Sequence, residues 1–232
     1  FRDVVVLATK FLICGTLVAK LPYDKVGKIR EKNRRLGLGL MGMHEWLIKR
    51  GEEYVVTEEL HRWLSIYRGV SDSTSKHYAD SLCVSRPKAN RAIAPTGSIG
   101  ILAGTTTGIE PLFAAAYKRR YLKGTKWHYQ YVVDGVAQEM ANNYEVNPDS
   151  LETSMSLASK AEQRIKFQAN VQDYVDMAIS STINLPRWGT ENNTEDNVDD
   201  FINILARYSH RIRGFTCYPD GSRGGQPLIN VD

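Results

Sequence analysis

Cysteine is scarce in this chain, and no stretch is long and apolar enough to cross a membrane. The three cysteines among 232 residues, Cys14, Cys83 and Cys217, are odd in number and widely spaced, which argues against a disulfide framework or a zinc site. No run approaches the roughly 20 apolar residues of a membrane-spanning helix. The apolar stretch at residues 4–18 also lacks a signal-peptide cleavage pattern. We therefore expect a cytoplasmic protein without membrane contact.

The chain also lacks a strong net charge. Its formal charge is +4, and its shares of apolar (42%) and charged (24%) residues are ordinary for a globular protein. The densest basic cluster, Lys118, Arg119 and Arg120, is interpreted as a solvated surface, because no helix-turn-helix, RNP or zinc-finger pattern accompanies it. We therefore expect no nucleic-acid partner.

Several common site motifs are present only in part. His44 and Glu45 begin like the zincin motif, but Ile48 occupies the position of the second histidine, so no metal site is expected. Residues 37–42 match the G-x-G-x-x-G pattern of dinucleotide binding, yet the residues before them are too polar for the strand that this pattern requires. Close packing of a glycine-lined strand or turn against a helix at residues 44–50 explains them better.

The most informative segment that is present spans residues 94–111. It contains four glycines and two prolines, and no charge appears in it before Glu110. Backbone N–H groups of such a segment can come close to a phosphate, and the hydroxyl groups of Thr96 and Ser98 can donate further hydrogen bonds. A glycine-rich strand bend with small residues for packing explains the same composition. The residues by themselves leave both interpretations open.

Helical periodicity alternates with short β-prone segments along the chain. Helices are expected at residues 4–21, 57–82 and 162–179, followed by one that Thr194 caps and Gly214 closes. Short strands are expected at residues 91–94, 129–133, 181–186 and 215–218, whereas 113–121 fits either a helix or a strand. Residues 24–35 read as a polar connection. The alternation predicts an α/β fold with mainly parallel pairing, in a chain without an evident linker.

Four motifs, in an order that the family shares, resemble the large catalytic chain of ribonucleotide reductases, and most closely its adenosylcobalamin-dependent class. They are residues 33–42, the segment 94–111, the Ser-Ser-Thr-Ile-Asn-Leu-Pro of residues 180–186, and the Tyr-Pro-Asp-Gly-Ser-Arg of residues 218–223. The resemblance implies that residues 1–232 are the C-terminal part of a ten-stranded α/β barrel, contributing a parallel five-stranded half with surrounding helices. It also implies an oxidoreductase that makes deoxyribonucleotides for DNA synthesis by thiyl-radical chemistry, with adenosylcobalamin as cofactor.

The resemblance further assigns substrate binding to the positions that match the family's phosphate-binding motif. These are Pro95, Thr96, Gly97, Ser98 and Ile99. The implied substrate is a ribonucleoside di- or triphosphate.

The chain departs from the family pattern where the radical chemistry is expected. The family carries its radical cysteine in an Asn-x-Cys-x-Glu finger loop, and none of the three cysteines here has those neighbours. No catalytic residue is therefore assigned. A Cys-x-x-Cys tail and a pair of adjacent tyrosines near the C-terminus are also missing, and the missing tyrosine pair favours the cobalamin class. Pro219 stands where the family often has arginine.

These departures lead us to expect a partner. The radical cysteine should lie on an N-terminal half, either in the same longer chain or on a separate chain, and this portion should be inactive without it. A homodimer is a further arrangement that the sequence leaves open. The alternative hypothesis is a non-catalytic nucleotide- or phosphate-binding module, or an assembly subunit.

Overall fold

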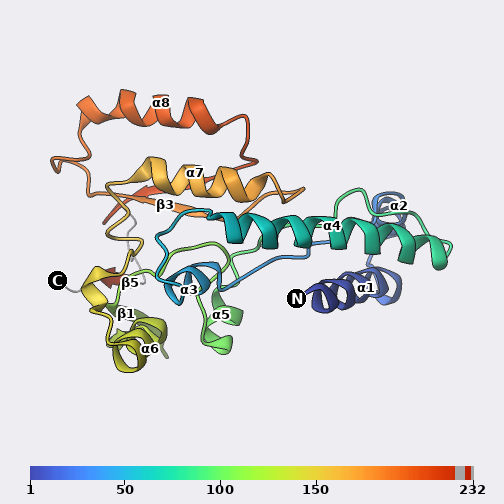
Figure 1. Cartoon of the computed structure of the whole chain (residues 1–232), viewed down its shortest axis with the longest axis horizontal. Coiled ribbons are helices and arrows are strands. Elements are labelled where there is room, and N and C mark those ends of the chain that lie inside the picture. The colour runs from blue at the N-terminus through green and yellow to red at the C-terminus, as the bar shows by residue number, and fades with distance from the viewer. Residues whose placement is uncertain (223–227, 231–232) are drawn as a thin grey trace.

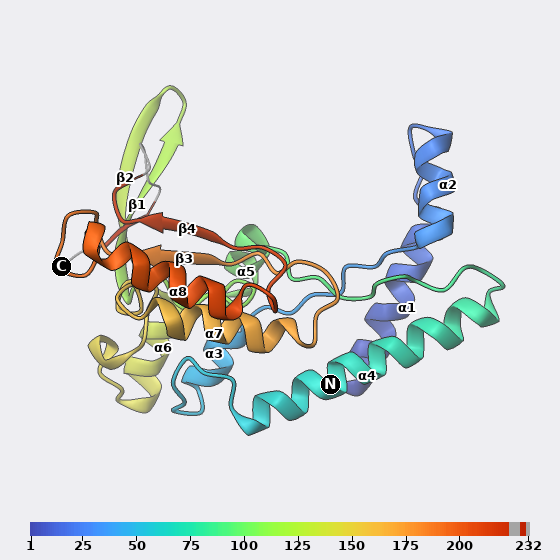
Figure 2. The same ribbon diagram turned by 90° about the horizontal axis from the view of Figure 1, so that it is seen from above.

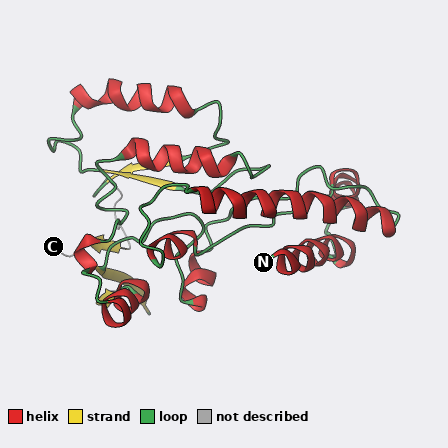
Figure 3. Cartoon of the chain, in the orientation of Figure 1, coloured by secondary structure: helices red, strands yellow, loops and turns green. Residues whose placement is uncertain are grey.

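The computed structural model describes residues 1–222 and 228–230, in which five helices precede the first strand and helices and strands are mixed after it (Figures 1 and 3). The helices are α1 (Arg2–Val18), α2 (Asp24–Asn33), α3 (Met43–Ile48), α4 (Glu58–Ser81), α5 (Gly97–Ala103), α6 (Gly135–Tyr144), α7 (Ala161–Gln172) and α8 (Val198–Tyr208). The strands are β1 (Ala116–Lys123), β2 (Lys126–Val133), β3 (Thr182–Leu185), β4 (Thr216–Pro219) and β5 (Leu228–Asn230). Short 3-10 turns lie at Pro148–Ser150 and Glu195–Asn197.

Short parallel segments lie side by side in the centre of the described part of the chain. β3 pairs with β4, and the bridges Ile93–Ile179 and Leu38–Arg91 add two further segments on the side of β3 away from β4. The N–H of Ser180 donates to the carbonyl of Ile93 at 2.8 Å. This hydrogen bond joins the residues that lead into β3 to the segment around Ile93. The array is not closed, and the described residues do not reach the expected five-stranded half.

The second sheet is antiparallel, and here the prediction of mainly parallel pairing is wrong. Its strand order is β2-β1-β5, with β1 antiparallel to both neighbours. Only Gly124 and Thr125 connect β1 to β2, and so short a connection allows only antiparallel pairing. Residues 113–121 fitted either a helix or a strand in the sequence, and the chain enters strand β1 at Ala116. Figure 2 shows the β1–β2 hairpin projecting from the body of the molecule.

The predicted helices are largely confirmed, with corrections at their ends. α4 begins after Thr57, whose hydroxyl accepts a hydrogen bond from the N–H of Leu60 at 3.3 Å. α7 ends at Gln172 rather than at residue 179, because the side-chain amide of Gln172 donates to the carbonyls of Val175 and Met177 and holds a turn there. That turn leads the chain back into the parallel array.

Two other expectations for the helices need correction. Residues 24–35 contain α2, and none of its side chains is buried, so no apolar periodicity announced it. Thr194 forms a capping box with Asn197 over the 3-10 turn that precedes α8, and α8 ends at Tyr208, before Gly214.

The core lies between the helices and the parallel segments, where α7 sits between β3 and α8 (Figure 1). The rings of Tyr54 and Phe167 stack in it with their centroids 4.0 Å apart. Other fully buried members are Leu47, Leu64, Tyr67, Ile93, Ile109, Leu157 and Val171. Among the described residues, no helix combines the length and the apolar character needed to cross a membrane.

Candidate functional site

A cavity of about 520 Å³ lies toward the carboxyl ends of the parallel segments. Its described lining includes Pro95, Gly97, Ile101, Thr105, Thr106, Thr107, Glu110, Tyr117, Arg119, Asp134, Thr182, Asn184, Tyr218, Pro219 and Asp220. These residues come from β1, β3, the end of β4, the segment after Ile93 together with α5, and Asp134 before α6. In folds built on parallel strands, ligands bind at this end because the loops that follow the strands converge there.

The segment of residues 94–111 passes from the strand at Ile93 directly into α5. Thr96 is the N-cap residue, with a left-handed φ of 50°. Its Oγ1 accepts a hydrogen bond from the N–H of Gly108 at 2.8 Å, which ties the start of α5 to the end of the segment. A Cβ at Gly100 would lie 2.7 Å from Cγ2 of Thr107. The segment therefore packs closely, as the packing interpretation requires, and it also opens a helix beside the cavity.

The predicted phosphate-binding residues surround the start of α5, but they do not all face the cavity. Pro95 and Gly97 line it. Thr96 uses its hydroxyl oxygen to hold the turn. Ser98 is exposed and Ile99 is 59% exposed, and both lie outside the cavity lining. The N–H groups of residues 97–99 belong to the first turn of a helix, where no intrahelical acceptor exists.

Glu110, the first charge of the segment, connects the cavity to the core. Its carboxylate accepts from Nη2 of Arg164 at 2.6 Å and from the N–H of Thr182 at 2.7 Å. Arg164 also donates to the hydroxyl of Tyr54 and the carbonyl of Thr182, each at 2.6 Å, and is only 3% exposed. The sequence reasoning missed Arg164. The available signal was its position three residues before Phe167, on the apolar face of a helix.

His44 is a core residue with a defined partner. Its Nδ1 accepts a hydrogen bond from the N–H of Leu112 at 2.9 Å, and its ring meets Tyr54 edge-on. Burial, and to a smaller extent the nearby charge of Arg164, lower the pKa of His44 to about 3. The imidazole is therefore neutral. In the part of the chain that the structure describes, no three His, Cys, Asp or Glu residues gather where they could hold a metal ion.

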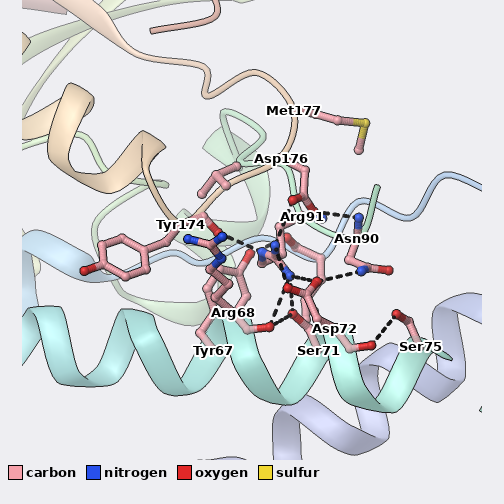
Figure 4. Close-up of polar contacts among 12 residues, drawn as sticks. Tyr67, Arg68, Ser71, Asp72, Ser75, Asn90, Arg91, Tyr174, Asp176 and Met177 are labelled. Atoms are coloured by element: carbon pink, nitrogen blue, oxygen red, sulfur yellow. Dashed lines mark hydrogen bonds and ion pairs between the residues drawn. The ribbon is translucent and has the colours of Figure 1, made fainter. Parts of the chain in front are cut away.

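A second buried arginine, Arg91, joins α4 to the loop after α7 through polar contacts (Figure 4). Arg91 is 1% exposed and pairs with Asp176 at 2.8 Å and with Asp72 of α4 at 2.5 Å. Its Nε donates to the carbonyl of Tyr174 at 2.7 Å. Because Arg91 does not line the cavity, we assign it the role of holding α4 and the loop after α7 against the parallel array.

The glycines of residues 37–42 serve close packing. A Cβ at Gly39 would lie 2.8 Å from the carbonyl oxygen of Ala92 on the neighbouring segment. Gly42 has a φ of 76° and precedes α3 as its N-cap residue. The packing explanation is thus supported over dinucleotide binding, although the neighbour that requires glycine at residue 39 is a strand segment rather than α3.

The cysteines lie outside the described cavity lining. Cys14 is partly buried, with its Sγ 3.4 Å from the hydroxyl of Tyr78. Cys83 is exposed and Cys217 is partly buried on β4. Of the motif at residues 218–223, Arg223 lies outside the described residues.

Comparison with known proteins places this geometry in a family. Residues 86–218 match the family model described as "Ribonucleotide reductase, barrel domain". A vitamin B12-dependent ribonucleoside-diphosphate reductase of Mycobacterium tuberculosis (strain CDC 1551 / Oshkosh) is 28% identical, over 99% of this chain and 37% of that protein. A reductase of the same name from Thermoplasma acidophilum is 27% identical, over 98% of this chain and 34% of its own length. The chain thus spans about a third of the length of these curated relatives.

A solved structure supports the fold. The crystal structure of a B12-dependent (class II) ribonucleotide reductase matches with a TM-score of 0.76 at 17% identity, over all of this chain and 36% of the other. The described residues therefore have the fold of one part of that barrel, and their parallel array does not close by itself. Since the matching family model covers more than half of the sequence, this chain belongs to the ribonucleotide reductase barrel-domain family.

Proposed function

We propose that this chain is the C-terminal portion of the catalytic barrel of an adenosylcobalamin-dependent ribonucleotide reductase. The complete barrel would have ten strands, and residues 1–232 would supply most of one parallel half. The enzyme would convert ribonucleotides to deoxyribonucleotides for DNA synthesis. The observation that carries this proposal is the opening of α5 at a cavity near the carboxyl ends of the parallel segments, within the region that matches the barrel-domain family.

The role of this portion would be to bind the substrate phosphates. The free N–H groups of residues 97–99 would donate to phosphate oxygens, and Pro95 and Thr96 would fix the backbone that presents them. Ser98 and Ile99 are exposed at the same helix start, where the hydroxyl of Ser98 could add a donor. Glu110 and Arg164 would hold the far end of the segment in place. The substrate class is a ribonucleoside di- or triphosphate.

Adenosylcobalamin is proposed as cofactor from the relatives, which are named as vitamin B12-dependent enzymes. When bound, this group supplies the radical that starts the reaction. The described residues do not form a site for it by themselves. The cavity of about 520 Å³ has the size of a small-ligand site, and no described cysteine lines it to receive a radical. We therefore assign no residue of this chain to the cobalamin.

The radical cysteine is proposed to lie on an N-terminal half, in the same longer protein or on a separate chain, and a homodimer is one arrangement of the whole. Nucleotide reduction with adenosylcobalamin should be absent from residues 1–232 alone. It should appear when a partner bearing Asn-x-Cys-x-Glu is added. Turnover by the chain alone would overturn this division of roles.

A binding experiment tests the phosphate site itself. A Cβ at Gly97 meets no protein atom within 4 Å, so Gly97→Ala should preserve the fold while placing a methyl group in the cavity lining. We expect calorimetry to show ribonucleotide binding weakened by about tenfold, the equivalent of one lost phosphate hydrogen bond. Gly27→Ala is the matched control, because a Cβ there also meets nothing within 4 Å and lies on α2. Equal affinities for both variants and the wild type would refute the assignment.

A further inference from the structure

The basic cluster of residues 118–120 is divided between the two faces of the β1–β2 hairpin. Successive side chains of a strand point to opposite faces, so Arg119 shares a face with Tyr117, whereas Lys118 and Arg120 share the other. The surroundings agree with this alternation. Tyr117 and Arg119 line the cavity, and neither Lys118 nor Arg120 does. Arg120 instead lies over the ring of Trp127, 3.9 Å from its centroid. The interpretation of the whole cluster as a solvated surface therefore fails for Arg119.

Arg119 is the one cation among the described residues of the cavity lining. Its guanidinium carbon lies 5.9 Å from the centroid of the Tyr121 ring, near the limit of a cation–π contact. The hydrogen bond from Nη2 to Oε1 of Gln130 is long, at 3.4 Å, and the buried Nε has no hydrogen-bond partner. None of the ion pairs found among the described residues includes Arg119.

Two of the carboxylates in the described lining have defined partners other than Arg119. Glu110 is paired with Arg164, and Asp134 caps α6 by accepting from the N–H of Val136 at 2.8 Å. Asp220 also has an interaction of its own. A guanidinium that faces a ligand-sized cavity without a carboxylate partner is suited to an anion that enters with the ligand. Phosphate oxygens match the planar donor array of arginine particularly well.

We propose that Arg119 is a specificity-determining residue that contacts the substrate phosphates and makes the cavity select nucleotides over nucleosides. This inference rests on the proposed function of the cavity. The start of α5 offers only neutral N–H groups to the phosphates, whereas Arg119 offers a full positive charge from β1. The energetic benefit of Arg119 should therefore grow with the number of phosphate charges on the ligand.

Calorimetry with one ribonucleoside and its mono-, di- and triphosphates tests this inference on the purified protein. Arg119→Gln should weaken di- and triphosphate binding by about tenfold or more, the usual effect of losing a charge-assisted hydrogen bond. The same variant should leave nucleoside binding unchanged, and the salt dependence of nucleotide binding should decrease. Arg119→Lys, which keeps the charge, should recover part of the affinity. Arg120→Gln is the matched control on the opposite face and should bind all ligands like the wild type.

The outcomes separate this inference from the function on which it rests. If the wild type binds none of the nucleotides, the proposed function of the cavity fails. If the wild type binds them and Arg119→Gln binds them equally well, the role of Arg119 is refuted. An equal loss for nucleoside and nucleotides would refute it too, because it would show that Arg119 supports the shape of the cavity rather than recognising charge. Thermal unfolding of each variant checks that the fold is retained.

Discussion

Removing the negative charge of Glu110 should destabilise the protein far more than removing a comparable charge from the surface. Arg164 is almost fully buried, with 2% of its side chain exposed, and Glu110 balances its charge at 2.6 Å. In Glu110→Gln the guanidinium stays buried without a counter-charge. Breaking a buried pair in this way costs about 3–5 kcal/mol. The Glu110 side chain is 21% exposed and glutamine keeps one acceptor oxygen, so we expect a cost just below this range, about 2–3 kcal/mol.

Urea unfolding followed by tryptophan fluorescence measures this change in the free energy of unfolding. With a urea dependence of about 2–3 kcal/mol per molar, the midpoint should fall by about 1 M. Glu162→Gln is the matched control, because Glu162 pairs with Arg207 at the surface, where the two side chains are 44% and 60% exposed. It should cost less than about 1 kcal/mol.

A double-mutant cycle isolates the pair from the other contacts of Arg164. Arg164→Met also removes the hydrogen bonds to Tyr54 and to the Thr182 carbonyl, so it should be costly by itself. Adding Glu110→Gln to Arg164→Met should then cost little, since no buried cation is left uncompensated. Strict additivity of the two changes, or a Glu110→Gln effect as small as that of Glu162→Gln, would refute the reasoning.

Two further predictions concern His44 and Arg91. Because burial lowers the pKa of His44 from 6.5 to about 3, the unfolded chain takes up a proton that the folded chain does not. The stability from this group is therefore complete above pH 6.5 and is lost as the pH falls toward 3, by about 2 kcal/mol between pH 7.5 and 5. Urea titrations across this range should show the loss in the wild type and in the exposed-residue control His77→Gln, and a flatter profile in His44→Gln; an unchanged profile would contradict the assignment. Arg91→Lys should lower the free energy of unfolding by about 2–3 kcal/mol in the same assay, because one ammonium cannot reproduce the separate contacts to Asp72, Asp176 and Tyr174. If this variant were as stable as the wild type, the role of Arg91 in holding α4 and the loop after α7 would be contradicted.

The local features of the fold were predictable where one strong signal controlled them. The helical periodicity of residues 57–82 located α4, and the paired glycines correctly indicated tight packing near Gly39. The end of α7 was not predictable from periodicity. The pattern of apolar residues continues to residue 179, but the amide of Gln172 captures two carbonyls and ends the helix. α2 escaped detection because it buries no side chain.

The sequence by itself determined the family and the segment at the centre of the candidate site. Ordered motifs identify a family because each preserves a local backbone requirement, such as the turn into α5 after Pro95. The residues that complete the site were decided only by tertiary structure. Arg164 comes from a helix 54 residues beyond Glu110, and Arg119 acquires its meaning only because β1 turns it toward the cavity and away from Arg120. Burial and the direction of a side chain depend on what packs around it, so a basic cluster in the sequence became one candidate phosphate contact and two residues on the opposite face.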